Sequence, residues 1–171
     1  MTDYAKLPLW IEDELVRVVV ETPRGARVKL AYDRKLACFR MSRALPLGIA
    51  YPFDWGFLPS TLGEDGDPLD AMVIHDAPTS PGLVIPSRIV GALKVKQTAE
   101  GKSERNDRFI AVPVNDSHAT LRDVNDLSKD AKWQMEKFFE ASVITENKQL
   151  SFLGWAGPAE ALKLIKAGEK S

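Results

Sequence analysis

The sequence lacks the features that mark several large classes of protein. It has one cysteine, Cys38, in 171 residues, so no disulfide can form within the chain. No apolar run approaches the roughly 20 residues that a membrane-spanning helix needs. The start, "MTDYAKLPLW", has no basic segment followed by a long apolar one, as a secretion signal would. We therefore predict a cytoplasmic protein that makes no membrane contact.

An excess of charge of either sign is also missing. Lysine and arginine together number 23 and aspartate and glutamate 24, so the net charge is -1 at pH 7. Proteins that bind nucleic acids usually show a basic excess, so we expect no nucleic-acid partner. The hydrophobic fraction of 44% is ordinary for a globular protein, and neither a repeat nor a Gly/Ser-rich linker divides the chain. These properties predict a single domain over residues 1–171.

Short strand patterns fill the first two-thirds of the sequence, and helical patterns come after them. Ser128 is suited to be the N-cap of a helix over 129–143, and Pro158 to be the first residue of a second helix over 158–168. This order predicts an α+β domain, mainly β, in which helices pack outside a small barrel. The expected strands cover residues 15–23, 26–33, 35–43, 69–76, 83–97 and 108–114, with a polar turn at 101–107.

The segment over residues 45–68 has no clean period and is rich in proline, glycine and aromatic residues. A long irregular segment within a compact domain is usually functional, so we expect a functional loop here. Its aromatic residues occupy alternate positions, a pattern more typical of packing than of a surface on which bases stack. They are Tyr51, Phe53, Trp55 and Phe57.

Three aspartates, Asp65, Asp67 and Asp70, fall within six positions of the stretch "EDGDPLD". Such crowded carboxylates repel one another, and a hard divalent cation would stabilise them. An EF-hand is excluded because that loop requires glycine at its sixth position, which is Asp70 here. From the spacing alone, a solvated acidic turn remains an equal alternative.

The stretch "DGDPLD" is similar to the signature of the soluble inorganic pyrophosphatases. Further segments resemble that family in order over roughly residues 15 to 160, among them "VVVETPRGARVKLAYD", "VGALKVK" and "RFIAVP". The resemblance implies a five-stranded, OB-like closed barrel with helices packed outside, two of them near the C-terminus. It also implies hydrolysis of pyrophosphate to two phosphates with Mg²⁺, or with Mn²⁺ in its place, by a homo-oligomer that is a trimer or a hexamer.

The same resemblance assigns metal-binding roles to four acidic residues. Asp65 and Asp70 match metal ligands, and Asp70 is the one expected to bridge two ions. Asp67 matches the general base and belongs to the metal site as well, while Glu21 matches an acid that engages metal-bound waters.

Substrate-binding roles follow for basic residues. Lys29 and Arg43 match cations that bind phosphate, and Arg108 replaces a lysine in that role. Trp55 stands where the family has a tyrosine, so it keeps one hydrogen-bond donor but loses the phenol.

Several other positions depart from the family pattern. Gln97 and Asn106 stand where the family has aspartate ligands, and they keep a carbonyl oxygen but no charge. Strand alternation places Asn106 on the same face as Arg108 and turns Asp107 away, unless a bulge brings Asp107 or Glu104 into the site. The remaining departures replace a glutamate, a tyrosine and a lysine with Ala31, Ser142 and Val143, respectively.

Two hypotheses about function therefore stay open. The first is a pyrophosphatase that is weak or has an altered metal dependence, because the aspartate box is complete. The second is a related protein on the same fold that binds or cleaves another phosphorylated compound, because the substitutions reshape the pocket. A barrel that binds oligonucleotides, as OB-folds do, is disfavoured by the net charge of -1.

Overall fold

The computed structural model describes residues 2–117 and 119–170, and its centre is a closed ring of five β-strands. Each strand of the ring is hydrogen-bonded to the next, and the last pairs with the first, so the ring has no free edge. The expected five-stranded, OB-like barrel is confirmed. In order around the ring the strands are β2 (Leu15–Thr22), β5 (Asp54–Phe57), β6 (Asp70–Val73), β9 (Arg108–Pro113) and β7 (Val84–Ala99).

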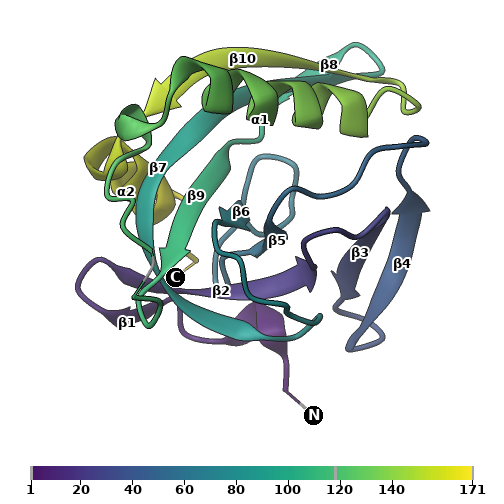
Figure 1. Ribbon diagram of the computed structural model, residues 1–171. Coiled ribbons are helices and arrows are strands. Elements are labelled where there is room, and N and C mark those ends of the chain that lie inside the picture. Colours follow the sequence, from purple (N-terminus) through teal and green to yellow (C-terminus); the bar gives the residue numbers. More distant parts are fainter. Residues whose placement is uncertain (1, 118, 171) are drawn as a thin grey trace.

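Five further strands extend or flank this ring. Two of them, β3 (Val28–Asp33) and β4 (Cys38–Ala44), form a hairpin that stands beside the barrel (Figure 1). The other three pair with strands of the ring: β1 (Trp10–Glu12) with β2, and both β8 (Lys102–Arg105) and β10 (Lys148–Ala156) with β7.

Both expected helices are present and begin as the sequence predicts. The first, α1 (Lys129–Ser142), is capped by the hydroxyl of Ser128, which accepts from the backbone N–H of Ala131 at 3.0 Å. The second, α2 (Pro158–Ala167), begins at its proline. Figure 1 shows α1 lying along β10, and α2 packs against β7. Single 3-10 turns occur at Tyr4–Lys6 (η1) and Val124–Asp126 (η2). In the described part of the chain, neither helix combines the length and apolarity needed to cross a membrane.

Four strands lie where the sequence patterns did not predict them. β1 precedes the first expected strand, β5 falls within the segment expected to be irregular, β8 lies within the expected polar turn, and β10 follows α1 although strands were expected to precede helices. β5 is buried at all four positions, so it has no alternation to detect. β8 is a short, polar edge strand, which its composition does not distinguish from a turn.

Side chains on both faces of the barrel strands are buried, which explains why several of these strands are apolar at every position. On β9, Phe109 and Ala111 join a cluster that includes Ile165 of α2. Their neighbours Ile110 and Val112 join a second cluster that includes Phe139 of α1. The two helices thus cover different parts of the same barrel.

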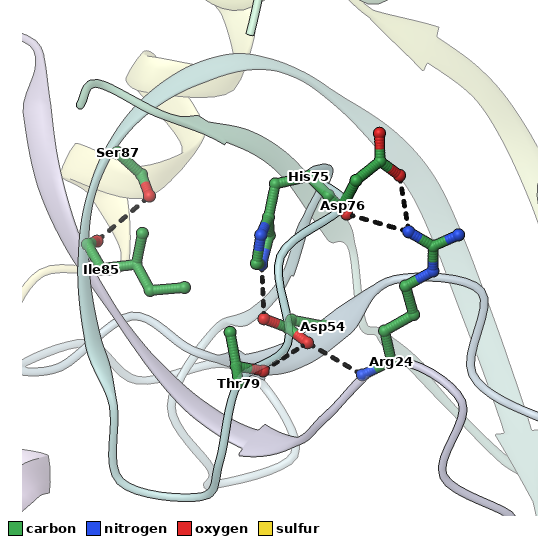
Figure 2. Close-up of polar contacts among 7 residues, drawn as sticks. All are labelled: Arg24, Asp54, His75, Asp76, Thr79, Ile85 and Ser87. Carbon is green, nitrogen blue, oxygen red and sulfur yellow. Dashed lines mark hydrogen bonds and ion pairs between the residues drawn. The ribbon is translucent and has the colours of Figure 1, made fainter. Parts of the chain in front are cut away.

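A buried polar cluster lies past one end of β5 and β6 (Figure 2). Asp54, which is 1% exposed, accepts from the backbone N–H of Arg24 and the hydroxyl of Thr79, both at 2.8 Å, and lies 2.6 Å from Nε2 of His75. The carboxylate therefore ties three separate segments of chain together. Asp70 begins β6 at the opposite end, so the cluster is remote from the aspartate box.

Candidate active site

The predicted site residues converge on a small cavity of about 130 Å³ at the mouth of the barrel. The loop that carries the aspartate box forms one wall, and the C-terminal end of α1 with the start of β10 forms another. The residues with predicted or questioned roles that line this cavity are Lys29, Arg43, Trp55, Asp65, Asp67, Asp70, Gln97, Asn106, Arg108, Ser142 and Val143.

A larger cavity of about 460 Å³ adjoins the first on the side of the β3–β4 hairpin. Lys29, Asp67 and Asp70 line both cavities and so form their shared wall. Glu21 and Ala31 line the larger cavity only. Asp67 and Asp70 therefore lie between the other two predicted acidic ligands: Asp65 is on the side of the small cavity, and Glu21 is on the side of the larger one.

Strand register brings Asp70 and Arg108 together. β6 and β9 are parallel neighbours, and Asp70, the first residue of one, is paired with Arg108, the first residue of the other. Their side chains form an ion pair with 2.6 Å between Nη1 of Arg108 and Oδ2 of Asp70. The carboxylate expected to bridge two metal ions is thus held by an arginine in this structure.

A tight turn presents the other two aspartates of the box. Gly66 has a φ of 85°, a left-handed conformation that favours glycine, and it lies between Asp65 and Asp67. The backbone N–H of Asp67 donates to Oδ1 of Asp65 at 3.1 Å, and the N–H of Gly63 donates to the carbonyl of Asp67 at 2.7 Å. These bonds leave the carboxylate of Asp67 without a hydrogen-bond partner among the described residues, at the wall that the two cavities share.

Within the described part of the chain, three buried donors around the small cavity also lack hydrogen-bond partners. They are Nη1 of Arg43, Nε1 of Trp55 and Nε of Arg108. Trp55 is 4% exposed and Arg108 6%, and the guanidinium of Arg108 lies 5.3 Å from the centre of the Trp55 ring. Leaving a buried donor unpaired is unfavourable by about 1–3 kcal/mol. These donors favour an anionic ligand on their side of the cavity, whose other side carries Asp65, Asp67 and Asp70.

Burial destabilises the charged forms of three acidic residues of the site, Glu21, Asp65 and Asp70. Burial raises the pKa of Glu21 to about 7, although a hydrogen bond from the backbone N–H of Tyr32 opposes the shift. Burial also raises the pKa values of Asp65 and Asp70, in the latter case against the attraction of Arg108. A divalent cation with oxygen ligands would relieve this cost, so the donors fit Mg²⁺ or Mn²⁺. Within residues 2–117 and 119–170, however, no three acidic, histidine or cysteine side chains are grouped so that they could hold a metal ion as they stand.

The two acids considered as substitutes for missing ligands do not line either cavity. Asp107 accepts from the backbone N–H of Val95 at 2.9 Å and pairs with Arg105 at 2.8 Å. Glu104 pairs with Lys102. The carbonyl-bearing side chains of Gln97 and Asn106 line the small cavity instead.

Two charged residues of the small cavity were missed by the sequence analysis. Glu146 lies 3.3 Å from Arg43, measured from Oε2 to Nη2, and Lys148 is the first residue of β10. Both reach the site only because β10 pairs with β7, and β10 was not predicted. The one available signal was the alternation of Leu150 and Phe152 with polar residues.

Comparisons with known proteins point to one family. A family model described as inorganic pyrophosphatase matches residues 18–171. The inorganic pyrophosphatase of Synechocystis sp. is 35% identical over 165 residues, which is 96% of this chain and 95% of the relative. That of Streptomyces coelicolor is 38% identical over 155 residues, covering 90% of this chain and 93% of the relative.

A solved structure extends the agreement to three dimensions. The crystal structure of the inorganic pyrophosphatase from Thermus thermophilus superimposes with a TM-score of 0.89 at 34% identity, covering 98% of this chain and 97% of that one. With the matched sequence model and relatives of nearly equal length, this chain belongs to the inorganic pyrophosphatase family.

Proposed function

We propose that this protein hydrolyses inorganic pyrophosphate to two phosphates. The observation that supports this most directly is the set of unpartnered donors of Arg43, Trp55 and Arg108 around a cavity whose opposite wall carries Asp65 and Asp67. At about 130 Å³ the small cavity falls below the roughly 300–1,000 Å³ typical of pockets for organic ligands. It therefore suits a small inorganic anion.

The basic residues bind and orient the phosphoryl oxygens. Arg108 and Arg43 each offer a planar fork of donors, and Lys29 and Lys148 add positive charge from the hairpin and from β10. Trp55 donates its single N–H. Such preorganised donors stabilise the charge that accumulates on the transferred phosphoryl group and on the departing phosphate.

Asp67 acts as the general base in this proposal. Its carboxylate is free of hydrogen-bond partners among the described residues and faces both cavities, so it can accept the proton of an attacking water. The water oxygen bonds to one phosphorus, the bridging P–O bond breaks, and the bridging oxygen leaves with the second phosphate.

Four acids and two amides would hold the metal: Asp65, Asp67, Asp70 and Glu21, with the side-chain carbonyls of Gln97 and Asn106. The metal, Mg²⁺ or Mn²⁺, would neutralise the substrate and lower the pKa of the attacking water. Because Ala31, Gln97 and Asn106 carry no charge, we expect fewer ions than an all-acid site would bind.

Assembly and location are part of the same proposal. We infer a homo-oligomer, a trimer or a hexamer, in the cytoplasm, with pyrophosphate and not nucleic acid as its partner. Exposed apolar side chains such as Trp133 on α1 and Ile144 just after it, 55% and 74% exposed, supply surface for contacts between copies. Light scattering of the purified protein measures the assembly directly.

The test of function is phosphate release from pyrophosphate by the parent and by Asp67→Asn, with Mg²⁺ and Mn²⁺ compared. Removing a general base typically lowers the rate by about 10²- to 10⁴-fold, and we expect that loss here with an unchanged melting temperature. Asp126→Asn is the matched control, because this exposed aspartate in η2 lies outside both cavities. A parent without activity under either metal contradicts the proposed reaction. Activity of Asp67→Asn within threefold of the parent contradicts the assigned base.

A further inference from the structure

Arg108 is the most deeply buried of the basic residues that line the small cavity, with 6% of its surface exposed. Its Cζ atom lies over two aromatic rings, 5.3 Å from the centre of the Trp55 ring and 5.7 Å from the centre of the Phe139 ring. At such distances the electron-rich face of an aromatic ring attracts a cation, and the attraction is strongest where water is excluded. Both rings therefore act on the position of this charge.

The two rings are held firmly by the protein interior. Trp55 lies on β5 and is 4% exposed, and Phe139 lies on α1 and is 3% exposed. Their ring centres are 5.7 Å apart and their planes are inclined by 58°, so the rings meet as the two walls of a corner. Side chains packed in a core occupy fixed rotamers. This aromatic corner, formed by Trp55 and Phe139, is therefore present before any ligand binds.

The corner leaves the donors of the guanidinium available. A guanidinium is planar and its N–H bonds lie in that plane, so a ring that lies over its face does not compete for them. Nη1 of Arg108 donates to Oδ2 of Asp70 at 2.6 Å, and Nε has no hydrogen-bond partner within the described residues. At least one buried donor is thus free on the side of the small cavity.

Phe139 itself has no group that can bind a phosphate. Its ring offers neither a hydrogen-bond donor nor a charge, and it belongs to the same hydrophobic cluster as Trp55 and Ile110. An effect of Phe139 on anion binding must therefore pass through Arg108 or through the packing of the core. These two routes predict different results when Arg108 is replaced.

We propose that Phe139 is a positioning residue for the reaction: with Trp55 it holds the guanidinium plane of Arg108, so that the free donors of that group face the small cavity. This inference rests on the proposed function, because the anion that meets these donors is a phosphoryl group. An arginine that is already oriented loses little side-chain freedom when the anion binds. A lysine could not be oriented in this way, because its ammonium group has no plane.

The test is a double-mutant cycle on Phe139 and Arg108. Phe139→Leu keeps an apolar side chain but removes the ring face, and Arg108→Lys keeps the charge but removes the plane. Calorimetry without metal gives Kd for pyrophosphate in the parent, in both single variants and in the double variant. Phosphate release with Mg²⁺ gives kcat/KM for the same four proteins.

The two routes differ in how the effects combine. If Phe139 acts through the guanidinium, Phe139→Leu should raise Kd about tenfold when residue 108 is arginine and less than threefold when it is lysine. The value of kcat/KM should fall by similar factors. Equal factors in the two backgrounds would overturn the proposal, because they would show that Phe139 acts through packing alone.

Phe53→Leu is the matched control. Phe53 also lies beside an arginine, with Cζ of Arg24 6.0 Å from the centre of its ring, but neither residue lines either cavity. The change removes a ring beside a guanidinium, as Phe139→Leu does, and Kd should stay within twofold of the parent. A rise in Kd as large as that of Phe139→Leu would overturn the proposal, because it would show that any such loss weakens binding.

Fluorinated phenylalanine at position 139 tests the ring with little change in its shape. Each added fluorine withdraws electron density from the ring face and so weakens the attraction for a cation. Site-specific incorporation of rings with one, two and three fluorines should raise Kd in steps, with melting temperatures close to that of the parent. A Kd that does not depend on the number of fluorines would overturn the proposal, even if Phe139→Leu does not fold.

Failure of the positioning role and failure of the proposed function give different results. A parent that hydrolyses pyrophosphate, but in which Phe139 and Arg108 show no coupling, overturns the positioning role alone. A parent that binds pyrophosphate with the expected coupling, but releases no phosphate with Mg²⁺ or Mn²⁺, overturns the proposed function and supports the positioning role. A parent that does not bind pyrophosphate overturns both.

Discussion

Replacing Trp55 with phenylalanine should weaken the affinity for pyrophosphate strongly while changing the free energy of unfolding little. The indole is 4% exposed, its N–H has no partner among residues 2–117 and 119–170, and its ring packs against Tyr51 and Phe139 with centroids 6.1 and 5.7 Å away. Phenylalanine keeps an aromatic ring among these neighbours but removes the donor. The substitution thus isolates the N–H as far as one residue change can.

The effect on stability is a difference between two terms of similar size. A smaller ring leaves a void, which we estimate to cost about 1–2 kcal/mol. Removing an unsatisfied buried donor gains about 1–3 kcal/mol. The free energy of unfolding without ligand should therefore change by no more than about 1 kcal/mol in either direction.

The effect on binding has no such compensation. A hydrogen bond to a charged group contributes about 1.5–3 kcal/mol. Its loss should weaken binding of pyrophosphate about 10- to 150-fold, since each 1.4 kcal/mol is a factor of ten. Calorimetric titration measures the affinity, and urea denaturation of the same samples measures stability. A change in affinity below threefold would show that the N–H does not reach the anion, and a loss of stability above 3 kcal/mol would show that packing dominates the residue.

Three further outcomes follow from the charges and contacts of the structure. Without metal, Glu21 binds its proton more tightly in the folded state, because its pKa is about 7 there and 4.5 in the unfolded chain. The free energy of unfolding should therefore fall by about 3 kcal/mol as the pH rises from about 4.5 to about 7, and then level off. Urea denaturation across this range should show that decline reduced in Glu21→Gln, and equal slopes for the two proteins would refute the assignment. Gln97→Asp with Asn106→Asp should raise the number of Mg²⁺ ions bound and destabilise the metal-free protein, and unchanged calorimetric stoichiometry would mean that these side chains do not reach the metals. Asp54→Ala should lower stability by several kcal/mol by leaving the donors of Arg24, His75 and Thr79 unpaired, and a loss below 1 kcal/mol would show that water replaces the carboxylate.

Local sequence patterns were sufficient to predict a residue's position where that position depends only on the strand or helix to which the residue belongs. The alternation of β9, continued back through the two residues before it, places Asn106 and Arg108 toward the small cavity and Asp107 toward Val95 and Arg105, as the sequence predicts. The cap at Ser128 was equally predictable, because a hydroxyl before a helical pattern satisfies the first backbone N–H groups wherever the helix packs.

Long-range packing and irregular backbone account for what was missed. The register between β10 and β7 shifts between Phe152 and Gly154, so apolar residues change face partway along the strand and the period of two is interrupted. Lys148 and Glu146 are brought to the site by this pairing and not by any local motif. The ion pair between Asp70 and Arg108 likewise depends on the register of two strands 38 residues apart, which no spacing in the sequence encodes.

That ion pair makes the two kinds of ligand thermodynamically dependent on each other. A cation that binds Asp70 and an anion that binds Arg108 must each weaken the same 2.6 Å contact before it can make its own. Whichever ligand arrives first breaks the contact, and the second then binds to a partner that is already released. The coupling is positive and reciprocal: metal raises the affinity for phosphate by the same factor by which phosphate raises the affinity for metal. A protein that meets neither ligand remains closed on itself, with the carboxylate of Asp70 paired to the guanidinium of Arg108.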